Sequence, residues 1–153
     1  MDVSHLVELR PPPRVVLDRA AAHPDRNRFR VRNPDGSWTP VPWRDFAEQV
    51  RAVAASLRDR GVGPGDHVAV FGANSVAWAC AALGAQAAGA TMVPIYPAST
   101  AEQVRYVLEH AGCRAVFVTA GLRATLAAAG VAAPTIVIGL DDAGPGAAGA
   151  PTP

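Results

Sequence analysis

The longest uncharged stretch of the chain lies between Asp66 and Glu102, with His67 counted as neutral, and it restricts the fold more than any other feature. About 20 continuous apolar residues can span a bilayer, so a membrane helix is the first alternative to consider. Turn-forming residues interrupt the stretch after each short apolar run, at positions 72–75, 89, 94 and 97. The residues between these turns are mostly alanine and glycine, which gain little from contact with lipid. We therefore predict no transmembrane segment.

The pieces of this stretch read instead as one buried β-α-β unit. Residues 68–71 form a continuous apolar run, which is typical of a parallel strand buried on both faces. Residues 75–88 are rich in alanine and glycine and are apolar around most of the helix circumference, so we predict a central helix that approaches the sheet closely. A second strand pattern follows and ends near Tyr96.

Flanking segments continue the same alternation of strands and helices. From Trp43 to Leu57 the apolar residues recur at i, i+3, i+4 and i+7, which predicts an amphipathic helix covering the sheet, and Gly61 is placed to end it in the left-handed conformation. A capping-box pattern at residues 99–102 opens a further helix. Strands are expected at 115–118 and 135–138, with a short alanine-rich helix from about Leu122 between them. The fold class is thus α/β, with an open, mostly parallel, doubly wound sheet and right-handed crossovers.

The first 42 residues predict two smaller elements outside this sheet. Apolar residues between Val15 and Ala21 indicate a short peripheral helix. Residues 28–32 and 37–41 flank the turn sequence 33–36 (Asn-Pro-Asp-Gly), in which proline presets φ and glycine accepts a positive φ. We interpret these segments as a small peripheral β-hairpin.

Composition excludes several classes of function. The 14 basic and 13 acidic residues give a formal charge of +1, so no chain-wide basic field attracts nucleic acid or anionic membrane. Cys80 and Cys113 lie in apolar surroundings and are expected to be core residues in a reducing compartment rather than a disulfide or metal pair. The N-terminus shows no signal peptide, so we expect a cytoplasmic protein.

Ligands of an open parallel sheet bind beyond the carboxyl ends of its strands. The residues expected at those ends are 72–75, 94–97, 119–121, Asp141 and Asp142. A dinucleotide site needs three glycines after the first strand, but only Gly72 follows it, and a P-loop sequence is absent. Asn74 or Ser75 is better explained as a helix N-cap than as a phosphate contact.

Other kinds of site are equally poorly supported by the residues. The pair Asp141 and Asp142 lacks the further acidic residues and the lysine of a response-regulator pocket, because the chain contains no lysine. Tyr96 is expected to be partly buried and tethered by a hydrogen bond, although lining a pocket is the alternative. The chain has four histidines, at His5, His23, His67 and His110. None of them lies at metal-ligand spacing from another histidine, a cysteine or a carboxylate. We assign no catalytic, cofactor-binding or metal-binding residue to this chain.

The string from Trp43 to residue 118 resembles the N-terminal part of the adenylate-forming (AMP-binding) superfamily, and it looks most like long-chain fatty acid–CoA ligases (acyl-CoA synthetases). The residues that carry the resemblance are Trp43, 61–66, Asn74, Trp78, 88–90, 94–97 and 100–103. It extends over roughly residues 15–140. It implies an N-terminal extension (1–13) and an incomplete N-terminal part of an AMP-binding domain (14–140). Beyond Asp142 the sequence has no periodicity and no bulky apolar residue, so we expect residues 141–153 to form a disordered or linker tail.

For the full-length enzyme the resemblance implies ATP, magnesium and CoA as cofactors and a fatty acid as substrate. The family's phosphate loop, acyl pocket, ribose-binding aspartate and catalytic lysine would all follow Pro153, so no functional residue is carried over. The family also commonly has threonine where Pro42 stands, which removes a helix-capping hydroxyl. We therefore expect a fragment that is inactive alone, exposes an apolar sheet edge and tends to aggregate.

The expected partner is the missing remainder of a ligase or a full-length homologue, with no nucleic acid. Two alternatives stay open. One is a stand-alone α/β binding or interaction module, and the other is a fragment of an adenylate-forming enzyme for an aryl or amino acid. The sequence downstream of this chain would separate the fragment from the module.

Overall fold

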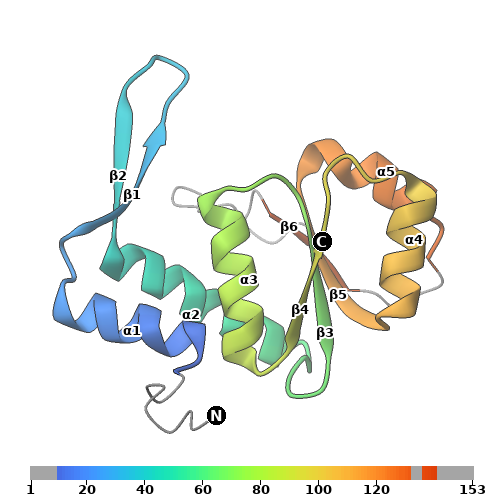
Figure 1. Cartoon of the computed structure of the whole chain (residues 1–153), viewed down its shortest axis with the longest axis horizontal. Helices are drawn as coiled ribbons and strands as arrows, with labels where there is room; N and C mark the ends of the chain where they lie inside the picture. The colour runs from blue at the N-terminus through green and yellow to red at the C-terminus, as the bar shows by residue number, and fades with distance from the viewer. Residues whose placement is uncertain (1–9, 132–135, 141–153) are drawn as a thin grey trace, which may run out of the picture.

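The structure is a computed structural model that describes residues 10–131 and 136–140. Its centre is a four-stranded parallel sheet made of β3 (His67–Phe71), β4 (Thr91–Ile95), β5 (Cys113–Val118) and β6 (Ile136–Gly139). The strand order is β4-β3-β5-β6, so the chain moves from β3 to one neighbour and then crosses to the other side (Figure 1). The predicted doubly wound α/β class is confirmed.

Helices cover both faces of this sheet. On one face α3 (Val76–Ala88) lies against β3 and β4, and α2 (Trp43–Asp59) and α1 (Pro12–Ala22) pack against α3 in the same hydrophobic core. The other packs against α4 (Ala101–His110) and α5 (Arg123–Ala128), which follows a short 3-10 turn at Ala120–Leu122. Figure 1 shows the two groups of helices on opposite sides of the strands. The helices predicted from the sequence therefore cover both faces of the sheet from within this chain.

A two-stranded antiparallel hairpin, β1 (Asn27–Arg32) and β2 (Trp38–Pro42), stands apart from the central sheet as predicted (Figure 1). Phe29 anchors its base, because its ring packs edge-on against Phe46 of α2 at 5.1 Å between centroids. At the tip, Gly36 has a φ of +86°, the conformation that the turn sequence predicts.

The ends of the helices follow the sequence signals closely. Gly61 ends the turn after α2 with a φ of +76°. The hydroxyl of Ser75 accepts a hydrogen bond from the Trp78 amide at the start of α3. A capping box opens α4, but the predicted register at residues 99–102 is wrong by one residue, because Thr100 is the N-cap and Gln103 is its partner. Pro42 gives α2 no side-chain cap, as expected from its missing hydroxyl.

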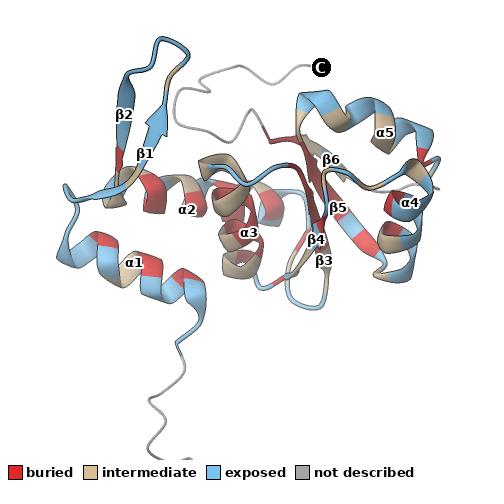
Figure 2. Ribbon diagram, turned by 45° about the horizontal axis from the view of Figure 1, so that its top comes forward, coloured by how far each residue is buried: buried red, intermediate tan, exposed pale blue. Residues whose placement is uncertain are grey.

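The interior of the described residues is wholly apolar, since none of the polar or charged side chains among them is buried. Buried positions line the strands and the inward stripes of the helices (Figure 2). None of the helices within residues 10–131 and 136–140 is long and apolar enough to cross a bilayer.

Candidate functional site

The carboxyl ends of the four parallel strands lie at one edge of the sheet. Residues 72–75 follow β3, residues 94–97 end and follow β4, and residues 119–121 follow β5. The structure therefore brings three of the four predicted segments to the same edge. The fourth, Asp141 and Asp142, lies outside the described residues.

The switch point of the sheet lies between β3 and β5, where a doubly wound fold usually holds its ligand. Side chains fill this point. A Cβ atom placed on Gly72 would lie 2.9 Å from Leu140 Cδ1 and 2.9 Å from Thr119 Cγ2. Leu140 is fully buried, and its amide donates to the Val118 carbonyl at 2.9 Å. Gly72 thus permits close apolar packing here, and it leaves no cradle for a phosphate.

The start of α3 is similarly occupied by its own cap. Ser75 Oγ accepts from the Trp78 amide at 3.0 Å, so this hydroxyl satisfies the helix and is not directed at a ligand. The N-cap interpretation of residues 74–75 is confirmed for Ser75. Asn74 lies just before it and is exposed.

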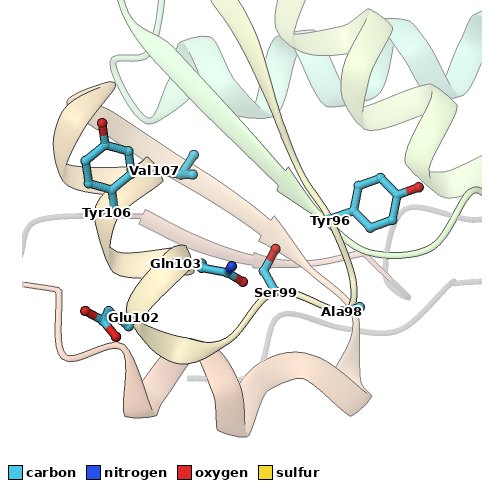
Figure 3. Close-up of a pocket in the computed structure, with 7 residues that line it drawn as sticks. All are labelled: Tyr96, Ala98, Ser99, Glu102, Gln103, Tyr106 and Val107. Atoms are coloured by element: carbon cyan, nitrogen blue, oxygen red, sulfur yellow. The ribbon is translucent and has the colours of Figure 1, made fainter.

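A surface hollow of about 720 Å³ lies between the loop after β4 and the outer side of α4 (Figure 3). Tyr96 and Tyr106 mark its opposite ends in Figure 3. Its lining residues are Tyr96, Ala98, Ser99, Glu102, Gln103, Tyr106 and Val107. Gln103 Oε1 accepts from the Thr100 amide in the α4 capping box, which leaves the NH2 group of Gln103, two phenols, one hydroxyl and one carboxylate as polar side-chain groups. This set can contact a partner, but it does not assemble a nucleophile with a base.

Tyr96 departs from the sequence expectation. Its side chain is 81% exposed rather than partly buried, and it lines the hollow, which was the alternative interpretation. Tyr96 directly follows β4 (Thr91–Ile95), so its exposure depends on the course of the loop beside α4 and not on the tyrosine side chain alone.

Both cysteines are buried and neither forms a disulfide. Burial raises the pKa of the Cys80 thiol to about 12, and its Sγ donates to Gln49 Oε1 at 3.2 Å. Burial also raises the pKa of Cys113, which is the first residue of β5. Both thiols are therefore protonated at neutral pH, so they are poor nucleophiles and poor metal ligands. Their expected role as core residues agrees with this environment.

The histidines that the structure describes lie on separate elements. His23 follows α1, His67 begins β3, and His110 ends α4 with its ring stacked on Tyr106 at 5.3 Å. Within the described ranges, no group of three histidine, cysteine or acidic side chains is arranged to hold a metal. His5 lies outside those ranges.

Asp66 is a polar residue whose role the sequence did not indicate. The Gly63 amide donates to its Oδ2 at 2.8 Å, and Arg114 on β5 lies 3.4 Å from the same oxygen. The Gly63 hydrogen bond first, and Arg114 second, hold the pKa of Asp66 below its usual value against the opposing effect of burial. The carboxylate therefore fixes the turn that leads into β3. Its part in the motif at residues 61–66 is structural.

The residues present do not fit the cofactors that the resemblance implies. Leu140 and Thr119 fill the switch point, and the described residues offer no metal-binding set. The 153-residue sequence also contains no lysine to stabilise charge on a transferred phosphoryl or adenylyl group. We therefore assign no step of a reaction to the side chains of residues 10–131 and 136–140.

The sequence of this chain matches a known protein family and several known proteins. The sequence model described as AMP-binding enzyme matches residues 16–150. The long-chain-fatty-acid–CoA ligase FadD15 of Mycobacterium bovis is 43% identical over 83 residues, which make up 54% of this chain and 14% of that protein. The uncharacterized protein Rv1549 of Mycobacterium tuberculosis is 41% identical over 92 residues, which make up 60% of this chain and 52% of Rv1549. The chain thus spans a small part of FadD15 and about half of Rv1549.

A solved structure agrees with these sequence matches. The crystal structure of the N-terminal domain of FACL13 from Mycobacterium tuberculosis superposes with a TM-score of 0.74 at 25% identity. The superposition covers 87% of this chain and 34% of the FACL13 chain. The chain therefore belongs to the AMP-binding enzyme family, and it corresponds to the N-terminal part of adenylate-forming enzymes related to long-chain fatty acid–CoA ligases.

Proposed function

We propose that this chain is the N-terminal scaffold of an ATP-dependent acyl-CoA synthetase that acts on a long-chain fatty acid. The observation that carries the proposal is the family match over residues 16–150, together with 43% identity to a protein named as a long-chain-fatty-acid–CoA ligase. In such an enzyme the fatty acid and ATP give an acyl-adenylate and pyrophosphate. CoA then displaces AMP to form the thioester. ATP, magnesium and CoA belong to that whole enzyme.

The contribution of this chain is structural. Its parallel sheet, packed on both faces, supplies a rigid platform, while the reacting groups come from the rest of the ligase. That remainder is either continuous with this chain or a separate polypeptide, including a full-length homologue. The chain by itself is inactive, and we expect it to work in the cytoplasm.

An activity assay in two arms tests this proposal. The chain is first incubated with ATP, magnesium, a C16 fatty acid and CoA, and no acyl-CoA should form above the blank. It is then co-expressed with FadD15 from which the 83 matching residues have been removed, and acyl-CoA formation should recover. Truncated FadD15 without this chain is the control. Acyl-CoA formation by the chain alone, or no recovery in the second arm, would contradict the proposal.

The complemented enzyme can also be used to find which class of acid it activates. Pyrophosphate exchange is measured in the complemented enzyme with the C16 acid, an aryl acid and a set of amino acids. Exchange that depends on the fatty acid supports the proposal. Exchange that depends on an aryl or amino acid instead supports the alternative of a different adenylate-forming enzyme.

A stand-alone interaction module is the second candidate. Two observations favour it: about half of Rv1549 is accounted for by the segment that matches this chain, and both faces of the central sheet are covered here without further sequence. A module of this kind should be a monodisperse monomer with a sharp thermal transition. Sequencing the DNA directly downstream separates the candidates, because a phosphate-loop sequence there supports the ligase and an unrelated neighbour supports the module.

A further inference from the structure

The β1–β2 hairpin carries a concentration of positive charge that the chain as a whole does not show. Four of the 14 basic residues lie between positions 26 and 42, namely Arg26, Arg28, Arg30 and Arg32, but only one of the 13 acidic residues, Asp35, does. This segment thus has a formal charge of +3, whereas the whole chain has +1. The hairpin also projects away from the helices and the central sheet (Figure 1).

The two faces of the hairpin differ in chemistry. Phe29 and Val41 pair across the strands, and both contact the core over α2. Side chains alternate between faces along a strand, so Arg30 and Arg32 point the other way. Directly opposite residues of an antiparallel pair share a face, which places Trp38 beside Arg32. The outer face therefore combines two arginines with an indole that is 58% exposed.

The guanidinium groups on this face are not neutralised by nearby acids. Within the part of the chain that the structure describes, no carboxylate lies within 4.0 Å of Arg30 or Arg32. Asp25, just before the hairpin, pairs with Arg44. Asp35, at the tip, accepts hydrogen bonds from the amide and the hydroxyl of Ser37. The positive charge of the outer face thus remains available to an external partner.

The tip is held in place by its own hydrogen bonds. The amide of Asn33 donates to the hydroxyls of Ser37 and Thr39 at 2.8 and 3.0 Å. The Asn33 backbone amide donates to the Ser37 carbonyl at 2.8 Å. The hairpin can therefore present its outer face without first becoming ordered, which lowers the entropic cost of binding.

We propose that the outer face of this hairpin, formed by Arg30, Arg32 and Trp38, docks on the surface of an anionic phospholipid bilayer. Arginine is attracted to anionic headgroups, and tryptophan is enriched at the membrane–water interface because one part of its ring system is apolar and its N–H is polar. The two-stranded hairpin projects from the described helices and from the central sheet, so its outer face can reach a flat surface (Figure 2). The proposal does not depend on the enzymatic role of the family.

Vesicle flotation tests the proposal with the full 153-residue chain, because aggregated protein sinks and is not counted as bound. Vesicles of phosphatidylcholine and phosphatidylglycerol (3:1) are compared with pure phosphatidylcholine. The chain should float only with the anionic vesicles, and high salt should release it. Each arginine near such a surface contributes about fivefold in affinity, so Arg30→Gln/Arg32→Gln should bind about 25-fold more weakly. Trp38→Gln should also reduce binding.

The matched control is Arg51→Gln/Arg105→Gln, which removes the same charge from exposed positions on α2 and α4. It should retain binding to the anionic vesicles within about twofold, since the effect falls off within a Debye length. Equal binding by the two double variants would overturn the proposal, as would equal flotation with uncharged vesicles. Tighter binding to a DNA duplex or to polyglutamate than to the vesicles, lost in Arg30→Gln/Arg32→Gln, would overturn it in favour of a nucleic acid or an acidic protein.

Discussion

The two faces of the central sheet are covered in different ways. On the side of the sheet that carries α1, α2 and α3, which we call the α3 face, the uncharged helix α3 lies so close to α2 that a glycine, Gly84, is required at the contact. On the opposite α4 face, two shorter helices carry charged residues on their outer sides and leave a hollow of about 320 Å³ beside β6. The first face is thus tightly filled, whereas the second has room to adjust.

The two edge strands of the central sheet also differ in how much apolar surface they expose. Val137 on β6, at the edge of the sheet, is half exposed and lines the hollow of the α4 face. The opposite edge strand β4 contains Pro94, which cannot donate to a further strand and so protects that edge. The predicted apolar edge is therefore confined to the β6 side.

Truncating a buried leucine on each face should give the largest difference. Leu57 on α2 and Leu108 on α4 are both almost completely buried, but Leu108 borders the hollow. Leu57→Ala should lower the free energy of unfolding by about 4 kcal/mol, because its neighbours cannot collapse into the space. Leu108→Ala should cost only about 2 kcal/mol, because the site can relax. Urea denaturation of both variants measures the difference, and equal losses would refute unequal packing of the faces.

Adding a single methyl group tests the close approach on the α3 face. A Cβ on Gly84 would lie 2.3 Å from Val53 Cγ1 and 3.2 Å from the Val50 carbonyl oxygen. Gly84→Ala should therefore lower the free energy of unfolding by about 2 kcal/mol, although alanine is the better helix former. The measurement is again a urea titration.

Two further variants isolate the steric cause. Gly121→Ala, where a Cβ would meet nothing within 4 Å, should have little effect. Val53→Ala in the Gly84→Ala background should restore part of the lost stability, since the two side chains compete for one space. If the double variant is less stable than the sum of the single effects predicts, the contact does not limit the packing of these helices.

Much of this architecture could be predicted from the sequence, because its signals are local. The 3.6-residue period from Trp43 to Leu57 and the capping-box pattern at residues 99–102, which marks the start of α4 to within one residue, each place an element without reference to the rest of the chain. The apolar runs of β3 and β5 indicate parallel strands for the same reason. The exposure of Tyr96 could not be read in this way, since it depends on where the loop after β4 runs relative to α4.

The candidate site is the less predictable part. Segment positions at the carboxyl edge follow from the strand order, but the filling of the switch point by Leu140 and Thr119 requires long-range contacts around Gly72. The pairing of Asp66 with Arg114 joins residues that are 48 positions apart in sequence. The composition also gave no warning of the arginine face of the hairpin, because acids elsewhere cancel its charge.

The smallest effect concerns the start of α4 compared with the start of α2. On the α4 face, Thr100 Oγ1 accepts from the Gln103 amide, and Gln103 Oε1 accepts from the Thr100 amide. Thr100→Ala should lower the free energy of unfolding by about 1 kcal/mol, because α4 buries only Val104 and Leu108 to compensate. The neighbouring Ser99→Ala, outside the capping box, is the control and should be neutral. By contrast, α2 starts at Pro42 without a side-chain cap and relies on six buried residues. Equal thermal midpoints for Thr100→Ala and Ser99→Ala would show that burial of apolar side chains is enough to hold α4, as it is for α2, without a side-chain cap.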